Sequence, residues 1–568
     1  MKPIFDWFAA NPYILLFFVV GGAVAVGKIT VKGYGLGMVA AAIVVGAGLS
    51  AWASTYGTAL KLDNFAKSLF YYLFMYGVGL RVGPSFINSL KGDGLKFTVL
   101  AVFCSFLGLF GAVLFTRWWS LPDGAAGGIL AGAMTMSAAI GSAEEAVRQG
   151  VFKLADGQTA ESVSGMIALS YGLTYIWGTV GIILICKYLP RWWGIDAKAA
   201  AKKYEDANGV RNVDDAGLTG YRPLAMRAYR LTNNETAGQT VRQFVQKHPE
   251  YKIINVGRGN ENLGAANDLQ LQKGDVIALG GRIEAMTANM GLIGPEVSDS
   301  KALNVPIDSA EILVTNKAMV GKELGELRNT PIAGTIALHH IERGGETIPM
   351  GLNTRLERFD VLFVGGVKSS IDRAGEILGK IARPSTSTDL FTLAAGMILG
   401  FLIGAIDFPL AGSRVGLGNA GGLLVSGVIV SSIVSRVRFF GSTPNAARNI
   451  LEDLGLVVFI AIVGINAGPG FIAGLQQVGL SLFLWGVVAT VLPLIAAVLI
   501  GYHIFKFHPA ILFGVCAGVR TTTAALGMVQ EAARSKVPAL GYGMPYAIGN
   551  TVLTIFGMVI VLLMSRGA

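Results

Sequence analysis

Charged residues are scarce in this sequence. Asp, Glu, Lys and Arg make up 14% of the 568 residues, whereas soluble domains carry about 25%. Residues 97–116 and 454–505 contain none of the four. Because roughly 20 consecutive apolar residues form a helix long enough to cross the bilayer core, both segments are predicted to span a membrane. The composition excludes an ordinary soluble protein and predicts a polytopic α-helical membrane protein.

Cysteine and histidine are also rare. The chain has three Cys and five His, and Cys104, Cys186 and Cys516 lie far apart in apolar surroundings. This spacing predicts neither a disulfide framework nor a metal site. The sequence also contains no catalytic dyad or cofactor motif that we can identify, so we expect no enzyme activity, no cofactor and no metal.

Apolar stretches form two sets of candidate spans. The first set lies near residues 12–29, 34–51, 65–90, 95–117, 125–149 and 162–186, and the second near 390–408, 416–435, 451–475, 479–503, 509–531 and 541–565. The opening apolar run has no cleavage-like end, so we interpret it as a first span rather than a removed signal peptide.

A polar region, residues 187–389, separates the two sets. It holds 26 Lys and Arg against 24 Asp and Glu, whereas the remaining residues hold 20 against 12. The positive excess therefore lies in the membrane parts, where cytoplasmic loops carry Lys and Arg, and no basic stripe predicts nucleic-acid binding. We expect a first membrane half (1–186), a linker (187–222), two α+β domains (223–300 and 301–383) and a second membrane half (384–568).

The polar region contains a tandem repeat. Two units with the same order of strands and helices each end in a strand that begins with Asp-Val, at Asp275-Val276 and at Asp360-Val361, and finishes with Gly-Gly. The units resemble the C-terminal domain of the potassium-uptake regulators, the TrkA-C or RCK-C module. The resemblance covers most of residues 223–383 and implies α+β domains that sense ligands and dimerise.

The two membrane halves also repeat each other. In the same order, residues 35–46 match 416–427, 78–86 match 463–471, 132–141 match 518–527, and 171–178 match 542–549. Duplicated halves are typical of secondary transporters, and interrupted helices at matching positions in both halves indicate the substrate site.

Loop charges predict the orientation of the chain. Arg436, Arg438, Arg448 and Lys506 lie at alternate ends of the second-half spans, which predicts that these ends and the polar insert are cytoplasmic. If the segments at 132–141 and 518–527 are re-entrant or broken, each half crosses about five times, the halves are inverted and both termini lie outside. If these segments span the membrane, the halves are parallel. We favour the inverted arrangement.

Two arginines, Arg81 and Arg520, lie within apolar segments. A charge inside a span is unfavourable by about 2.5–3.5 kcal/mol even on the mildest scale, so each is a candidate functional residue. The forked guanidinium group suits a carboxylate, and two of them suit a substrate with two carboxylates. The alternative is a structural arginine that snorkels or pairs internally, for instance with Glu531 or Glu145.

Small and polar residues at the matched interruptions complete the candidate substrate site. These are Gly83, Thr135, Ser137, Asn466, Thr521, Thr522 and Thr523. Hydroxyl and amide groups can bind carboxylate or ammonium groups, and Asn466 stands where the first half has Arg81. The alternative is that these residues only pack helices, which small and hydroxyl residues do in membranes.

The whole chain resembles the aspartate–alanine exchanger family. The resemblance rests on duplicated halves around two TrkA-C-like units, on Leu80-Arg81-Val82-Gly83-Pro84, and on the small and Thr-rich segments 132–141 and 518–527. It implies electrogenic antiport of L-aspartate for L-alanine across the bacterial cytoplasmic membrane. Members of similar architecture export other dicarboxylates such as succinate, which is the alternative. Met136-Ser137 departs from the family's Thr-rich pattern.

The resemblance also implies partners. These are the lipid bilayer, a small anionic amino acid or dicarboxylate as substrate, a second copy in a homodimer, and a small-molecule regulator at the TrkA-C-like domains. A further alternative is an RCK-regulated ion channel or ion transporter. A channel of that type requires a selectivity filter such as TVGYG, and the sequence has none.

Overall fold

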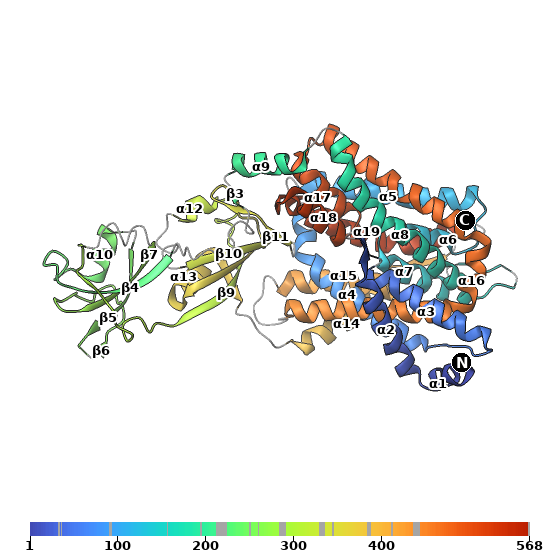
Figure 1. Cartoon of the computed structure of the whole chain (residues 1–568), viewed down its shortest axis with the longest axis horizontal. Coiled ribbons are helices and arrows are strands. Elements are labelled where there is room, and N and C mark those ends of the chain that lie inside the picture. Colours follow the sequence, from blue (N-terminus) through green and yellow to red (C-terminus); the bar gives the residue numbers. More distant parts are fainter. Residues whose placement is uncertain are drawn as a thin grey trace. The chain divides into compact units, whose positions relative to one another are not determined.

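The computed structural model divides the chain into two compact units. Met1–Lys202 and Thr386–Ala568 form the helical unit, and Lys203–Ser385 form the insert (Figure 1). The described residues are 1–31, 34–35, 37–89, 94–150, 152–155, 157–192, 196–208, 210–211, 224–248, 251–259, 261–282, 291–328, 336–343, 346–382, 388–410, 413–434 and 443–565. The predicted domain starts at 223 and 384, and the loop residues Arg436 and Arg438, lie outside them.

Helices make up almost all of the helical unit. Its first half contains α1 (Lys2–Ala10), α2 (Pro12–Gly27), α3 (Gly37–Thr55), α4 (Asn64–Ser89), α5 (Gly94–Trp118), α6 (Ala125–Ala133), α7 (Ser137–Arg148) and α8 (Ala160–Trp192). Its second half contains α14 (Leu390–Gly404), α15 (Gly418–Val434), α16 (Asn445–Leu499), the π-helix η2 (Ile500–Ile504), α17 (Pro509–Val519), α18 (Thr523–Ala533), the short 3-10 helix η3 (Val537–Gly541) and α19 (Gly543–Met564).

The predicted spans correspond to these helices. Among the described residues, six helical segments are long and apolar enough to cross a membrane, and a seventh is possible if the bent pair α1 and α2 forms one span. The predicted spans 451–475 and 479–503 join into the single helix α16. The predicted segments 125–149 and 509–531 are each broken, into α6 and α7 and into α17 and α18.

Large apolar side chains lie on the outside of the helical unit. On α5, Phe103, Phe106 and Phe110 are 46%, 54% and 63% exposed, and on α16 Leu480 is 74% exposed. Small residues such as Ala41 are buried instead. Extended exposed apolar surface marks contact with a membrane or a partner, and a surface of this kind around apolar helices fits lipid.

The internal repeat is visible in the backbone of the helical unit. A two-stranded hairpin precedes α3, formed by β1 (Thr30–Val31) and β2 (Tyr34–Gly35), and another precedes α15, formed by β15 (Asp407–Leu410) and β16 (Ser413–Gly416). Each hairpin leads into a glycine in the left-handed region, Gly37 at φ 71° and Gly418 at φ 63°. The same order of helices follows in both halves, which confirms the duplication.

The halves are inverted relative to each other. Helix α4 and the first part of α16 occupy equivalent positions in the repeat, and they pack antiparallel. Near the start of α4, Leu62 bonds Asn466 of α16, whereas further along α4 a Cβ on Gly77 would meet Glu452. Equivalent helices that run in opposite directions require a symmetry axis across the helices rather than along them. The prediction that the two halves are inverted is therefore confirmed.

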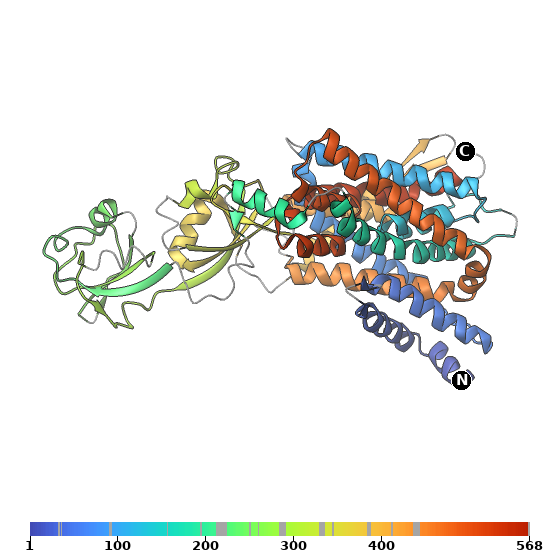
Figure 2. The same cartoon turned by 45° about the horizontal axis from the view of Figure 1, so that its top comes forward.

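Glycines allow the backbones of the two halves to approach closely. A Cβ on Gly79 of α4 would lie 2.9 Å from the Cα of Gly427 in α15, and a Cβ on Gly464 of α16 would lie 3.0 Å from the carbonyl oxygen of Ile43 in α3. These are equivalent contacts in the two halves, and Figures 1 and 2 show α4 beside α15 accordingly. Small residues that permit such close approach are typical of membrane helix packing.

The insert contains two five-stranded sheets with the same topology. The first, in the order β6-β5-β7-β4-β8, is built from β4 (Leu224–Arg230), β5 (Tyr251–Arg258), β6 (Glu261–Asn262), β7 (Val276–Arg282) and β8 (Glu296–Val297). The second, in the order β11-β10-β13-β9-β14, is built from β9 (Ile307–Val314), β10 (Ile336–Arg343), β11 (Glu346–Ile348), β13 (Val361–Val367) and β14 (Gly379–Ala382).

Short helices accompany both sheets of the insert. These are α10 (Val241–Lys247), α12 (Leu324–Arg328) and α13 (Lys368–Leu378). Within the predicted linker, α8 continues to Trp192, α9 (Ala197–Asn208) follows, and β3 (Val210–Arg211) pairs with β12 (Met350–Gly351). The register shifts at the same place in both sheets, between Ile253 and Asn255 and between Leu338 and His340, which supports a tandem repeat.

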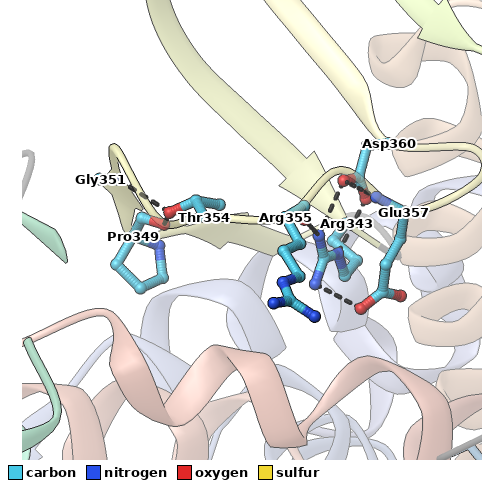
Figure 3. A network of polar contacts seen from close by, with 7 residues as sticks. All are labelled: Arg343, Pro349, Gly351, Thr354, Arg355, Glu357 and Asp360. Carbon is cyan, nitrogen blue, oxygen red and sulfur yellow. Dashed lines mark hydrogen bonds and ion pairs between the residues drawn. The ribbon is translucent and has the colours of Figure 1, made fainter. Parts of the chain in front are cut away.

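An Arg–Asp pair locks the same corner of each insert unit. Arg258 donates two hydrogen bonds to Asp275, both 2.9 Å, and Arg343 donates two to Asp360, both 2.8 Å. The second pair belongs to a larger network, in which Arg343 also bonds Glu357 at 2.6 Å (Figure 3). Burial by itself would lower the pKa of Arg343, but the Asp360 and Glu357 carboxylates outweigh this and raise it.

We expect Arg343→Met to destabilise the insert by about 3–5 kcal/mol, because the change leaves the Asp360 carboxylate, 1% exposed, buried without its cation. The matched control is Arg355→Met. Arg355 pairs with Glu323 at 3.3 Å but is 71% exposed, so its loss should cost less than about 1 kcal/mol. Urea unfolding of the purified full chain, followed by proteolysis within the insert, measures both. Equal losses of unfolding free energy in the two variants would show that the buried Arg343–Asp360 pair stabilises the insert no more than the exposed Arg355–Glu323 pair does.

Candidate functional site

Two helix breaks occur at equivalent points of the repeat. Met134, Thr135 and Met136 separate α6 from α7, and Arg520, Thr521 and Thr522 separate α17 from α18. Thr135 has φ 53° and Thr521 has φ 50°, a left-handed conformation that is unfavourable for a β-branched residue. Such strain in both halves indicates that a threonine is retained there for its side chain.

The two breaks meet and satisfy each other. The Thr135 hydroxyl donates a hydrogen bond to the Arg520 carbonyl, and the Thr521 hydroxyl donates one to the Met134 carbonyl at 3.1 Å. Thr135 corresponds to Thr521, and Met134 to Arg520, so the two bonds are related by the internal symmetry. Buried carbonyl groups freed at a helix break need such partners, since the membrane supplies no water.

Arg520 lies at this crossing and is completely buried. Its Nη1 donates to the Thr490 carbonyl at 2.9 Å and contacts the Met134 sulfur at 3.5 Å. Within the described part of the chain, its Nε and Nη2 have no hydrogen-bond partner, and it forms no ion pair. A buried guanidinium with two unused donors and no counter-charge is a strong anion-binding group.

The helix ends around Arg520 favour the same charge. Helices α7 and α18 begin directly after the breaks, and neither has a side chain that caps its first amides. The N-terminus of a helix carries a partial positive charge and free N–H groups. Two such ends and one arginine make the crossing electropositive, as broken helices do in transporters of anionic substrates.

The other candidates at the breaks lie close by. Ser137, the first residue of α7, shares a 2.7 Å hydrogen bond with the Tyr171 hydroxyl. Thr522 is buried and Thr523 is exposed. The structure therefore brings Thr135, Arg520 and Thr521 into direct contact, with Ser137 and Thr522 next to them in the chain.

The remaining candidates make their contacts elsewhere. Arg81 pairs with Glu452 at 3.1 Å and bonds Asn449 at 2.9 Å, so its charge is balanced within the protein. A Cβ at Gly83 would collide with the side chain of Ser431 in α15, which gives this glycine a packing role. Asn466 exchanges two hydrogen bonds with the backbone of Leu62, at 2.8 and 3.1 Å.

Sequence reasoning missed two acidic residues of the helical unit, Glu452 and Glu144, and named a third, Glu145, as a possible partner of an arginine. Glu452 is the partner of Arg81, and Glu144 forms a buried pair with Lys67 at 2.9 Å. Glu145 accepts hydrogen bonds from the amides of Asn419 and Ala420 at the start of α15, so it does not pair with either arginine. The signal was available, because charges inside apolar stretches are rare enough to list as functional candidates.

The three cysteines, far apart in sequence, lie in one buried apolar cluster. They come from α5, α8 and α17, the last of which ends at Val519, directly before Arg520. Among the described residues no group of three His, Cys, Asp or Glu side chains is arranged to hold a metal ion.

Long apolar helices, inverted halves and two crossing helix breaks define a multi-pass membrane transporter rather than an enzyme. The chain belongs to the aspartate–alanine exchanger family: the model of its predicted permease membrane region matches residues 13–191 and 392–562. A TrkA-C domain matches residues 310–379, which is the second unit of the insert. The first unit shares its strand order and its Arg–Asp pair.

Relatives cover the whole chain. An uncharacterized transporter of Bordetella parapertussis is 56% identical over 98% of this chain and 99% of its own, and one of Bordetella bronchiseptica is equally similar. An uncharacterized transporter of Shewanella oneidensis is 36% identical over 98% of both chains. No solved structure matches the chain.

We expect Thr521→Val to lower both transport and thermal stability. Valine keeps the shape of threonine but leaves the Met134 carbonyl buried without a partner, at a cost of about 1–3 kcal/mol. Thr521→Ser keeps the hydroxyl and should retain most activity. The control is Thr55→Val at the end of α3, where an exposed threonine hydroxyl also bonds a backbone carbonyl, that of Trp52, and this change should have little effect. The melting temperature in detergent and the exchange rate in proteoliposomes measure these effects. If Thr521→Val has the melting temperature and exchange rate of the wild type, the hydrogen bonds between the two breaks have no such role.

Proposed function

We propose that the protein is a secondary active antiporter of a small anionic amino acid, with electrogenic exchange of L-aspartate for L-alanine as the activity. The observation that supports it most directly is Arg520, a completely buried guanidinium with unused donors at the crossing of two broken helices. A carboxylate of the substrate would supply the missing counter-charge and accept the free N–H groups. Family membership supports the substrate class.

The charge of the proposed substrates explains the electrogenic exchange. Aspartate carries one net negative charge at neutral pH and alanine carries none, since their side chains differ by one carboxylate. Exchange of one for the other therefore moves one charge across the membrane. Arg520 should distinguish the two ligands, because it can bind the carboxylate that only aspartate has.

Arg81 has a conditional role in this proposal. Arg81 can contact a second substrate carboxylate only after its ion pair with Glu452 opens, because in this structure the Glu452 carboxylate balances the positive charge of Arg81. We therefore propose Arg520, Thr135 and Thr521 as the central group, with Ser137, Thr522 and Thr523 beside them, and assign Arg81, Gly83 and Asn466 to the helices that close around the site.

The inverted halves suggest how the site reaches both sides of the membrane. In a transporter with inverted repeats, the two halves can exchange conformations, so that a central site opens first to one side and then to the other. Both broken helices belong to this central site, and neither half contains the whole of it. We propose that the breaks move together during alternating access.

The insert is proposed as a regulatory part. Two TrkA-C-like units that bind a small molecule and help a homodimer form would modulate transport without lining the pathway. Its proposed location is the cytoplasmic side of a bacterial inner membrane, with both termini outside. These assignments rest on the family resemblance and on the loop charges.

Exchange in proteoliposomes tests the proposed function. Vesicles loaded with L-aspartate should take up labelled L-alanine, at a rate that responds to an imposed potassium diffusion potential. Arg520→Lys should reduce aspartate exchange at least tenfold, because lysine lacks the planar fork. Arg117→Lys is the control, since Arg117 is an exposed residue that bonds a backbone carbonyl. Exchange of succinate alone would favour the dicarboxylate alternative, and full activity of Arg520→Lys would place the substrate site elsewhere.

Cysteine labelling tests the proposed orientation. In a variant with Cys104, Cys186 and Cys516 replaced by alanine, cysteines introduced at Pro3 and Gly567 should react with a membrane-impermeant maleimide added to intact cells. A cysteine at exposed Glu235 in the insert should react only after the cells are lysed. Protection of both termini in intact cells would reverse the proposed orientation.

A further inference from the structure

A polar cavity opens near the start of α4. It has a volume of about 230 Å³ and is lined by residues of α4, α7, α8 and α16, among them Lys67, Glu144, Arg148 and Asn466. Pockets for drug-sized ligands span about 300–1,000 Å³, so this one suits a smaller solute. Two of the four helices that meet here, α4 and α7, are joined by an ion pair at the cavity.

That ion pair, Lys67–Glu144, is buried. The two side chains are 9% and 2% exposed, and Lys67 Nζ lies 2.9 Å from Glu144 Oε2. The other carboxylate oxygen, Glu144 Oε1, is buried and has no hydrogen-bond partner within the described part of the chain. A buried carboxylate oxygen without a donor is unfavourable, and a charge pair inside a membrane unit points to a ligand or ion pathway.

The charges around the cavity are mixed. Three cations line it, Lys61, Lys67 and Arg148, and three anions, Asp63, Glu144 and Glu161. A site for a simple anion would carry an excess of positive charge, as the Arg520 crossing does. Balanced charge around a small cavity instead matches a solute that carries both signs, such as the ammonium and carboxylate groups of an α-amino acid.

We infer that this cavity is a docking site for the zwitterionic head of an amino acid. The substrate ammonium donates to Glu144 Oε1, and its α-carboxylate accepts from the Lys67 ammonium, which has three donors and uses one on Glu144. Lys67 and Glu144 thus recognise the group that aspartate and alanine share. Glu144 lies seven residues beyond Ser137 on α7, roughly 10 Å along the helix, so the substrate reaches Arg520, which recognises the carboxylate that only aspartate has, in a later step. The inference rests on the proposed function and deepens it.

The internal repeat shows that the pair is specific to one half. At the matching register, Glu452 stands in place of Lys67, and Gln530 stands in place of Glu144. The equivalent of Lys67 therefore binds Arg81 of α4 instead of a residue of α18. An ion pair needed only to hold the broken helix would be expected in both halves, so its restriction to one half favours a role in recognition.

Glu144→Gln tests the inference on the full chain in proteoliposomes. The probes are L-alanine and L-aspartate, which carry an ammonium group, and succinate, which lacks one. We expect the variant to raise the half-saturating concentration of alanine and aspartate at least tenfold more than that of succinate. Glu531→Gln is the control, because Glu531 is an exposed carboxylate of α18 that does not line the cavity, and it should behave as wild type.

The double variant Lys67→Gln with Glu144→Gln separates recognition from folding. It removes both charges together, so it should melt close to the wild type yet still fail to prefer ligands with an ammonium group. Unchanged affinities in Glu144→Gln would overturn the inference, and so would an equal loss for all three probes.

The failure of the inference is distinguishable from failure of the proposed function. Wild-type protein that exchanges succinate but neither amino acid would overturn the zwitterion site and leave anion transport intact. If wild-type protein exchanges none of the probes, the proposed function fails. In that case, thermal stabilisation of the purified wild-type protein by millimolar L-alanine would still support the docking site, provided that Glu144→Gln loses the stabilisation. If L-alanine does not stabilise the wild-type protein, the docking site is overturned.

Discussion

The helical unit depends on one constraint, which is that a broken helix inside a membrane must find hydrogen-bond partners within the protein. Here each break supplies what the other lacks. The hydroxyl of Thr135 reaches the carbonyl of Arg520, and the hydroxyl of Thr521 reaches that of Met134. This exchange fixes the crossing point, brings two helix N-termini to it and keeps Arg520 in a place that water does not reach. The electropositive centre follows from that arrangement.

Much of this fold could be predicted from the sequence because the membrane halves and the insert units are duplicated. The matched segments predicted the two halves, their breaks and the tandem units of the insert, because a repeat compares the chain with itself. Thr135 and Thr521 were selected for the same reason, since each lies at an interruption, whereas Arg520 was selected as a charge inside an apolar segment. The matched segments that begin with Asp-Val and finish with Gly-Gly also predicted the strands β7 and β13 of the insert.

Other features depend on contacts between distant segments, which no local pattern encodes. Arg81 and Arg520 look alike in sequence, because each is a charge within an apolar segment. Only the packing of α4 on α16 shows that Glu452 balances the charge of Arg81, whereas two nitrogens of Arg520 have no hydrogen-bond partner among the described residues. The same holds for Lys67 and Glu144 and for the three clustered cysteines. The continuity of α16 was missed because the apolar stretch was divided into two segments of about the length of a single span, 451–475 and 479–503, whereas α16 runs through both.

The glycine contacts have a mechanical consequence. Where Gly132 of α6 meets α8 and Gly518 of α17 meets α19, a Cβ would lie within 2.6 Å of a backbone carbonyl oxygen, so these helices touch through their backbones. Interlocked side chains must change rotamer before two helices can move past each other, but smooth backbone surfaces need no such step. The first helix of each broken pair, α6 or α17, therefore packs on its neighbour with little interlocking of side chains. A bulky side chain at Gly132 or Gly518 would push the two backbones apart, and the proposed movement of the breaks would then require these helices to separate.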